Sequence, residues 1–452
     1  MMDRRGRFGS RIGVILASAG SAVGLGNIWR FPTEVGRNGG AAFILVYVCF
    51  VLFLAMPVMV SEFVIGRASK SNTVDAFRVL APGRPWVLTG LMGVIAGFLV
   101  LSFYSVVAGW TMHYAVSSLL GQLSAGHDFA ADFNAFISAP WLPLAYVAGF
   151  LVLTHLVVER GVQNGIERYS KWMMPLLFII IVVLVICSLQ MPGARAGLAF
   201  LLRPDFSKVT WQVVLSAIGQ AFFSLSVGIG CMITYASYFG PRMRLAPSAL
   251  HVCLIDTMVA VLSGFIIFPA VFSVEGLSVD AGPGLVFITL PNVFNTAFSH
   301  IPMVGYAFSL FFYVLLLLAA LTSSISMHEI CTAFIHEKYG LDRRVAAWIV
   351  TLACLLGGAA CSLSFGVWRG ITVGGMGFFD LFDYLTAKFI MPLGGILITL
   401  FVGWQMQRSQ VMDELTNGGT CSRVLARLLY FLIRWLAPIG VCTIFINGLI
   451  GH

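Results

Sequence analysis

The sequence predicts an all-α polytopic membrane protein, and two observations carry that prediction. Apolar residues make up 59% of the 452 residues, and charged residues make up only 10%. Soluble proteins contain about 25% charged residues, so most of this surface must face lipid. Apolar segments long enough to cross a bilayer recur along the whole chain, and they predict eleven transmembrane helices at about 8–36, 41–66, 86–121, 141–158, 173–191, 212–240, 245–273, 300–335, 345–367, 378–406 and 428–450.

The connections between these spans predict the orientation. Of the 27 Lys and Arg residues, 19 lie in segments on the side of the N-terminus, and the opposite loops hold few, among them Arg195, Arg203, Lys208 and Arg369. Cytoplasmic loops are enriched in Lys and Arg, so we expect a cytoplasmic N-terminus and, after eleven crossings, an outer C-terminus. The net charge of +8 therefore reflects membrane topology, and no nucleic-acid partner is expected.

Two outer segments interrupt the series of spans. Residues 122–140 are polar enough for a loop, and residues 274–299 carry prolines between short apolar stretches, which predicts a capping segment of small helices. No soluble domain is visible, so residues 1–452 are expected to form a single membrane domain.

The first and sixth spans share a glycine-rich pattern. Val23-Gly24-Leu25-Gly26 corresponds to Val227-Gly228-Ile229-Gly230, and five helices separate the starts of the two spans. An odd number of helices inverts the second copy, which predicts inverted repeats at about 8–191 and 212–406, with an extra helix at about 428–450. Glycine-interrupted helices at corresponding positions indicate a transporter binding site, although glycines also serve as close-packing contacts between intact helices.

A break in a helix leaves backbone groups unpaired where bulk water is absent, at a cost of several kcal/mol each. Free carbonyl groups suit a small cation, and free N–H groups at the start of a half-helix suit a carboxylate. The glycine pattern therefore predicts a bound amino acid with Na⁺ beside it.

Polar residues inside other spans agree with this interpretation. Ser224 and Ser226 flank the second glycine pattern, and Thr322-Ser323-Ser324 lies in the middle of the eighth span. An intramembrane carboxylate is a functional residue by default, and Asp256 in the seventh span is the strongest such candidate. For Glu62 in the second span we expect a structural role, accepting hydrogen bonds from the unwound backbone.

With these residues identified, the sequence resembles the neurotransmitter:sodium symporter family in its bacterial branch, whose structural prototype is the leucine transporter LeuT. The resemblance covers helices 1 to 10 and rests on the segments AVGLGN..RFP, NGG, GQ.FFSLS.G.G...TYASY and TSSI. It implies a LeuT-type 5+5 inverted repeat with broken helices 1 and 6, and a location in the bacterial inner membrane.

The resemblance also implies roles for matching residues. The first of two Na⁺ sites would use the Ala22 carbonyl, Asn27, Ser224 and Asp256, and the second would use Gly20, Val23, Ala319, Thr322 and Ser323. The substrate would contact Ser21, Ala22, Leu25, Gly26, Val100, Tyr104, Phe223, Ser226, Ile229, Ser323 and Met327. The outer gate would contain Arg30, Gln220 and Asp383 above a lid of Phe223 and Tyr104. The inner gate would contain Arg5, Ser237, Tyr238 and Glu337, with Phe8 where the family has tryptophan.

Departures from the family pattern refine the expected chemistry. Asp256 stands where most members have asparagine. The animal transporters recruit chloride there to supply negative charge. Because the Asp256 carboxylate supplies that charge itself, we expect no chloride requirement. Monoamine transporters place an aspartate near the position of Gly20, whereas here Ala19-Gly20-Ser21 offers no acid. A ligand with its own carboxylate and an apolar side chain is therefore expected, namely a neutral hydrophobic L-amino acid.

The predicted function is Na⁺-coupled uptake of that amino acid by alternating access, in a protein that is not an enzyme. The zinc-protease pattern beginning at His328-Glu329 fails because position 332 is threonine, and no G-x-S-x-G is present. The polar groups cluster at one depth rather than forming the stripe of a channel. A Na⁺-dependent amino-acid-binding sensor on the same fold stays open as the alternative. Beyond the lipid bilayer and the substrate, the sequence indicates no partner and no oligomeric state.

Overall fold

The computed structural model describes residues 6–123, 128–274, 284–298 and 301–450. All regular elements in this part of the chain are helices, and its one β-bridge, between Val373 and Met376, belongs to no strand. Up to the middle of the chain the elements are α1 Arg11–Ala22, η2 Gly26–Arg30, α2 Phe31–Arg37, α3 Ala41–Phe50, η3 Val51–Ala55, α4 Met56–Ser69, α5 Thr73–Leu80, α6 Val87–Leu119, α7 Phe129–Ser138, α8 Leu142–Val158, η4 Val162–Glu167, α9 Arg168–Ser188, α10 Ala194–Leu202 and η5 Phe206–Lys208.

The second half of the chain continues the helical series. Its elements are α11 Trp211–Ser224, α12 Cys231–Ser237, α13 Leu245–Val271, η6 Leu285–Thr289, α14 Leu290–Ala297, α15 Pro302–Tyr339, α16 Arg343–Leu363, α17 Phe378–Tyr384, η7 Leu385–Ile390, α18 Met391–Leu400, η8 Phe401–Gln405, α19 Arg408–Thr416, α20 Arg423–Phe431, η9 Leu432–Leu436 and α21 Ala437–Ile450.

The described residues contain eight helices long and apolar enough to cross a membrane. Two bent pairs bring that number to ten: α1 with η2 and α2, bent by 57°, and α7 with α8, bent by 76°. The sixth predicted span is divided into α11 and α12 by residues 225–230. The eleven predicted spans therefore correspond to continuous, bent or divided helices.

One predicted loop contains a helix. Within residues 122–140 the structure forms α7, because the side chain of Asp128 accepts hydrogen bonds from the amides of Ala130 and Ala131 and so caps the helix. Phe129 and Phe133 recur at helical spacing and are buried. The capping segment predicted around 274–299 is helical as expected where it is described, in η6 and α14; residues 275–283 and 299 lie outside the described residues.

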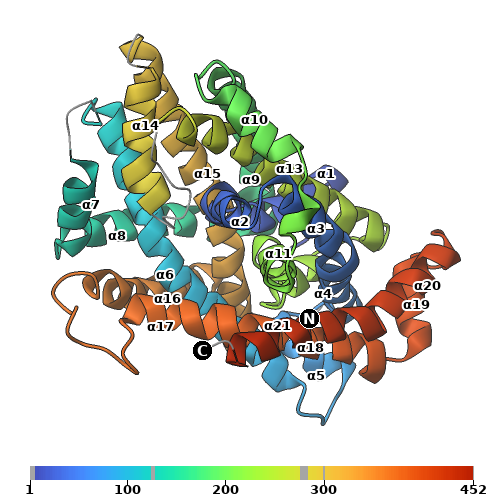
Figure 1. Ribbon diagram of the computed structural model, residues 1–452. Coiled ribbons are helices and arrows are strands. Elements are labelled where there is room, and N and C mark those ends of the chain that lie inside the picture. Colours follow the sequence, from blue (N-terminus) through green and yellow to red (C-terminus); the bar gives the residue numbers. More distant parts are fainter. Residues whose placement is uncertain (1–5, 124–127, 275–283, 299–300, 451–452) are drawn as a thin grey trace.

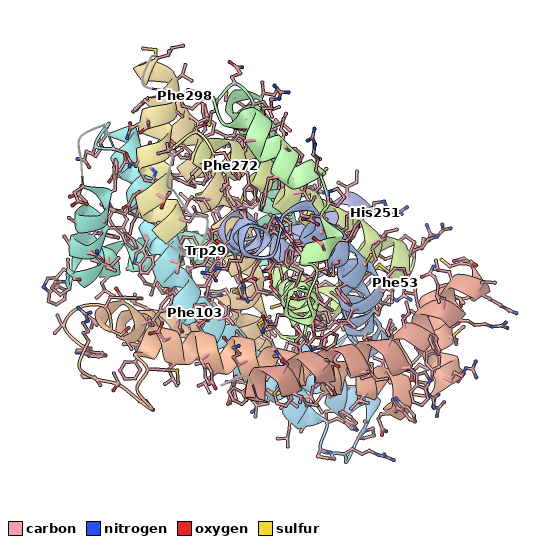
Figure 2. All side chains as sticks on the ribbon, viewed as in Figure 1. Trp29, Phe53, Phe103, His251, Phe272 and Phe298 are labelled. Carbon is pink, nitrogen blue, oxygen red and sulfur yellow. The ribbon has the colours of Figure 1, made fainter. Side chains whose placement is uncertain are left out.

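The broken helices lie in the interior of the bundle. Figure 1 shows the blue α1–α2 segment and the light-green α11 near the middle of the view, with the red α20 and α21 crossing its lower part. The long helix α6 packs along α15, α12 packs on α4, and α18 packs on α21. Figure 2 shows Phe53, which is 52% exposed, at the periphery, and Trp29 and Phe103 nearer the centre. Apolar side chains thus cover both the lipid face and the core.

Candidate substrate and sodium sites

The first span is broken beside its glycines. Helix α1 gives way at Val23 to extended backbone with ψ 113°, and the chain is helical again from Gly26. A Cβ atom added to Gly24 would lie 2.6 Å from the hydroxyl oxygen of Ser323 and 3.0 Å from that of Tyr104. Because only glycine leaves this space, side chains from α15 and α6 can approach the broken backbone directly.

The sixth span is broken by left-handed backbone. Ser226, Gly228 and Gly230 have φ values of 50°, 89° and 88°, and a right-handed helix cannot continue through such residues. Two of the three are glycines, which adopt this conformation at little cost. Both copies of the glycine pattern therefore coincide with breaks, and the prediction of broken helices 1 and 6 is confirmed.

The buried carboxylate of Glu62 supports the second break. Its Oε1 accepts a hydrogen bond of 2.7 Å from the Gly228 amide, and its Oε2 accepts one of 3.1 Å from the Met232 amide. Glu62 is fully buried, so these bonds replace the ones that the missing helical turn would have supplied. The expected structural role of Glu62 is confirmed.

Three residues predicted for the first Na⁺ site come together between α11, α13 and η2. The Asn27 amide nitrogen donates to Asp256 Oδ1 at 2.7 Å and to Ser224 Oγ at 3.1 Å, and Ser224 Oγ donates to Asp256 Oδ2 at 2.7 Å. All three side chains are at most 2% exposed. Carboxylate, amide and hydroxyl oxygens are hard ligands of the kind that small hard cations prefer.

Two further buried polar side chains come from α3 and α11. Tyr47 of α3 lies close enough to Asp256, Ser224 and Thr257 to interact with their side chains. Gln220 of α11, predicted for the outer gate, is 1% exposed, and both polar atoms of its amide are unpartnered among the described residues. Sequence reasoning missed Tyr47, although it is the single tyrosine of its span.

The residues predicted for the second Na⁺ site also meet. Ser323 Oγ of α15 donates to the Val23 carbonyl at 2.9 Å, and Thr322 Oγ1 lies 3.3 Å from the same oxygen and 3.0 Å from the Ala319 carbonyl. Gly20 adjoins them, because a Cβ atom added there would lie 3.2 Å from the Thr322 Cβ atom. Hydroxyl and carbonyl oxygens from α1 and α15 therefore face one another across the first break.

A cavity of about 40 Å³ lies between the two breaks. Ten of the eleven predicted substrate residues line it, and the exception is Ser21, whose hydroxyl donates to Ser326 Oγ at 2.6 Å. The lining also includes residues that sequence reasoning did not assign to the substrate. The full lining is Ala22, Gly24, Leu25, Gly26, Asn27, Val100, Phe103, Tyr104, Phe223, Ser224, Ser226, Ile229, Ser323, Met327, Thr386 and Met391.

The lining of this cavity separates into a polar end and an apolar end. At the polar end the Leu25 amide donates to the Tyr104 hydroxyl at 3.1 Å, next to the backbone of the first break. At the apolar end lie Val100, Ile229 and Met327, and no acidic side chain is among the lining residues that the structure describes. The site therefore offers backbone and hydroxyl groups to a charged head group and an apolar wall to a side chain.

Above the cavity, Phe223 and Tyr104 separate it from an outer vestibule of about 570 Å³. The Arg30 guanidinium carbon lies 3.9 Å from the centroid of the Phe223 ring, so the cation covers the lid directly. Asp383 also lines the vestibule, but among the described residues no carboxylate oxygen lies within 4.0 Å of Arg30 nitrogen. Gln220 is not part of the vestibule lining.

The inner side is closed by a different set of contacts. Phe8 packs edge-on against Tyr235 and Tyr238, and its amide donates to the Tyr238 carbonyl at 3.3 Å. The Tyr238 hydroxyl donates at 2.7 Å to Glu329, a fully buried residue that also pairs with Arg343.

Two other predicted inner-gate residues make further contacts. Glu337 accepts from the backbone and side-chain amides of Asn72 at 3.1 and 2.9 Å, and Ser237 donates to the Thr234 carbonyl at 2.5 Å. Arg5 lies outside the described residues. Sequence reasoning missed this role of Glu329 in packing, although a carboxylate within an apolar span was a signal for it.

The broken helices and the two groups of oxygen atoms beside them are the features expected of a sodium-coupled membrane transporter. The chain belongs to the sodium:neurotransmitter symporter family, whose model matches residues 5–135 and 137–452. It is 41% identical to the uncharacterized sodium-dependent transporter YhdH of Bacillus subtilis over 98% of this chain and 97% of that protein. It is 34% identical to an uncharacterized sodium-dependent transporter of Haemophilus influenzae over 99% and 98%.

A solved structure confirms the fold class. The crystal structure of MhsT in complex with L-phenylalanine matches with a TM-score of 0.89 and 43% sequence identity, over 98% of this chain and 100% of that one. The predicted all-α, LeuT-type architecture is therefore confirmed, and the chain is a sodium-dependent transporter of this family.

Proposed function

We propose that this transporter carries a neutral, hydrophobic L-amino acid into the cell together with Na⁺. The observation that carries the proposal is the central cavity, which joins the broken backbone near Leu25 and Gly26 to an apolar wall without an acidic side chain. An α-carboxylate would accept from amides at the start of the second half-helix and from the Tyr104 hydroxyl, because helix N-termini favour anions. The likeness to MhsT, solved with L-phenylalanine, supports this substrate class.

Two Na⁺ ions would travel with each amino acid. The first would be held by Asn27, Ser224 and Asp256 with the substrate carboxylate, and the second by backbone carbonyls of α1 with Thr322 and Ser323. Each net charge that moves inward gains about 2.3 kcal/mol per 100 mV of membrane potential. Both ion sites use atoms of the first break, so ion binding and the shape of helix 1 would be coupled.

Transport would proceed by alternating access. The wide outer vestibule ends at the Phe223 lid, and the packing of Phe8 against Tyr235 and Tyr238 blocks the inner side. Helices 1, 2, 6 and 7 would rock against helices 3, 4, 8 and 9, within inverted repeats at about 8–191 and 212–406 followed by a helix at about 428–450. The N-terminus would be cytoplasmic and the C-terminus outside the bacterial inner membrane.

Chloride would not be required. Asp256 already places a carboxylate where its two oxygens accept from Asn27 and Ser224. The Tyr47 hydroxyl would interact with the same negative charge. A second anion in this group would face like-charge repulsion at short range.

Uptake into proteoliposomes tests the proposal against the alternative of a sensor. A transporter accumulates labelled amino acid only with an inward Na⁺ gradient and exchanges it in counterflow, whereas a sensor binds the amino acid and accumulates none. Competition by the twenty amino acids should rank hydrophobic ones first, and a preference for a charged one would refute the substrate class.

A matched pair of variants tests the second ion site. Ser323→Ala should abolish Na⁺-driven uptake, because its hydroxyl bonds to Val23 of the broken helix. Ser324→Ala should retain uptake, because that hydroxyl bonds within its own helix and to Thr154. Equal activity of the two variants would contradict the assignment.

A further inference from the structure

Two arginine side chains share an aromatic wall where the tenth span ends and the eleventh begins. The Arg434 guanidinium carbon lies 4.3 Å from the centroid of the Trp404 ring and 6.0 Å from that of Tyr430. The Arg408 guanidinium carbon lies 5.6 Å from the same Tyr430 ring. The Trp404 indole nitrogen donates to the Arg434 carbonyl at 3.1 Å, which fixes the two helices side by side.

These two cations have no acidic partner. Among the described residues, no carboxylate oxygen lies within 4.0 Å of either guanidinium group, and Arg434 Nε is buried without an acceptor. The polar contact of the Arg434 head group is a 3.3 Å hydrogen bond to the Tyr430 hydroxyl. Glu414 of the adjoining helix α19 is already paired with Arg67. Two like charges held near one ring repel each other, and an anion between them would remove that cost.

The backbone at this place also favours an anion. Helix α19 begins at Arg408 with no side-chain cap and has no acidic residue in its first turn. Its first amides therefore lack intrahelical acceptors, and the helix dipole places partial positive charge there. The start of α19 and both guanidinium groups therefore favour a negatively charged ligand.

The position in the membrane identifies that ligand. Trp404 and Trp435 stack edge-to-face with centroids 4.8 Å apart and are 51% and 45% exposed, as expected for residues at a lipid–water interface. With the orientation proposed above, this interface faces the cytoplasm, where anionic lipids attract basic segments. We propose that Arg408, Arg434 and the start of α19 bind the phosphate of an anionic phospholipid, with Trp404 and Trp435 against its glycerol and upper acyl chains.

Binding of phosphatidylglycerol to the purified full-length protein tests the site. Native mass spectrometry in detergent would titrate dioleoyl phosphatidylglycerol against wild type and the double variant Arg408→Gln/Arg434→Gln, with dioleoyl phosphatidylcholine as the neutral lipid. Each basic residue near an anionic surface contributes about 1 kcal/mol, so losing both should weaken binding about 30-fold. Arg344→Gln is the matched control, since Arg344 is 76% exposed and lies outside this site.

Each outcome either supports the proposed phospholipid site or overturns it. Loss of the tightest phosphatidylglycerol in the double variant, with retention in Arg344→Gln, supports the site. Equal affinity of all three proteins overturns it, and so does equal competition by millimolar inorganic phosphate, which would indicate a free anion instead of a lipid. Arg408→Gln alone, at an exposed helix start, provides a second variant should the double variant misfold. The readout needs neither transport nor a known orientation, so it can fail while the proposed function stands.

Discussion

Replacing Asp256 by serine should make transport depend on chloride. In the structure Asp256 is fully buried, and its two oxygens accept hydrogen bonds of 2.7 Å from Asn27 and Ser224. Serine removes the negative charge and frees space beside those donors and the Tyr47 hydroxyl. A chloride ion could then accept from the same donors and restore the charge next to Na⁺.

The size of the effect follows from the charge that is lost. Opposite charges about 4 Å apart attract by about 4 kcal/mol at an effective dielectric constant of about 20. Part of this is recovered by water or hydroxyl oxygens, so we expect a net loss of about 3 kcal/mol. That loss raises the Na⁺ concentration for half-maximal uptake by about 100-fold in chloride-free buffer, and added chloride should reverse most of it.

The assay is Na⁺-dependent uptake in proteoliposomes with chloride or gluconate as the anion. Wild type should give the same Na⁺ curve in both, and Asp256→Ser should give a curve shifted toward high Na⁺ in gluconate. Asp383→Asn removes a vestibule carboxylate and should show no chloride effect. If Asp256→Ser takes up substrate in gluconate with the wild-type Na⁺ curve, the reasoning is refuted. If Asp256→Ser shows no uptake, Na⁺-stimulated substrate binding measured in chloride and in gluconate tests the same chloride dependence.

Three other substitutions test the breaks and the inner side. Glu62→Gln replaces a charged acceptor of two backbone amides, so it should lower the free energy of unfolding by about 1–3 kcal/mol, measurable as a lower melting temperature in detergent. Gly24→Ala should reduce uptake at least about tenfold through overpacking, because its new Cβ atom meets hydroxyl oxygens, whereas Gly219→Ala, with no atom within 4 Å, should be active. Glu167→Gln weakens the carboxylate that accepts two hydrogen bonds from the start of α1, so a cysteine at Ala17 should react faster with a thiol reagent, and an unchanged labelling rate would contradict this.

Much of the fold and of the site could be predicted because the signals are local. Span length and apolar content predict the helices. The V-G-[LI]-G patterns predict the breaks because glycine leaves space for close approach at Gly24 and allows left-handed backbone at Gly228 and Gly230. Asp256 and Glu62 were recognised as single carboxylates in apolar spans. The meeting of Asn27 with Asp256, by contrast, followed from the family resemblance and not from residue spacing.

Features that depend on long-range packing escaped prediction. Thr386 and Met391 line the central cavity because the tenth span crosses the second break, and no sequence pattern records that crossing. The pairing of Glu329 with Arg343 joins residues of two neighbouring helices, and sequence reasoning considered Glu329 only as part of an incomplete zinc pattern. Gln220 was expected above the lid, but its side chain is buried and is not part of the vestibule lining.

The division of the sixth span also bears on how the protein is assembled. Helix α11 has 14 residues and α12 has 7, so at about 1.5 Å per residue neither half spans the roughly 30 Å of hydrocarbon. Left alone in lipid, residues 225–230 would expose unpaired backbone groups. During membrane insertion this span must therefore remain beside the translocation machinery until partners such as Glu62 of α4 can satisfy its backbone. The same break that would hold substrate thus makes the span a late and dependent step of biogenesis.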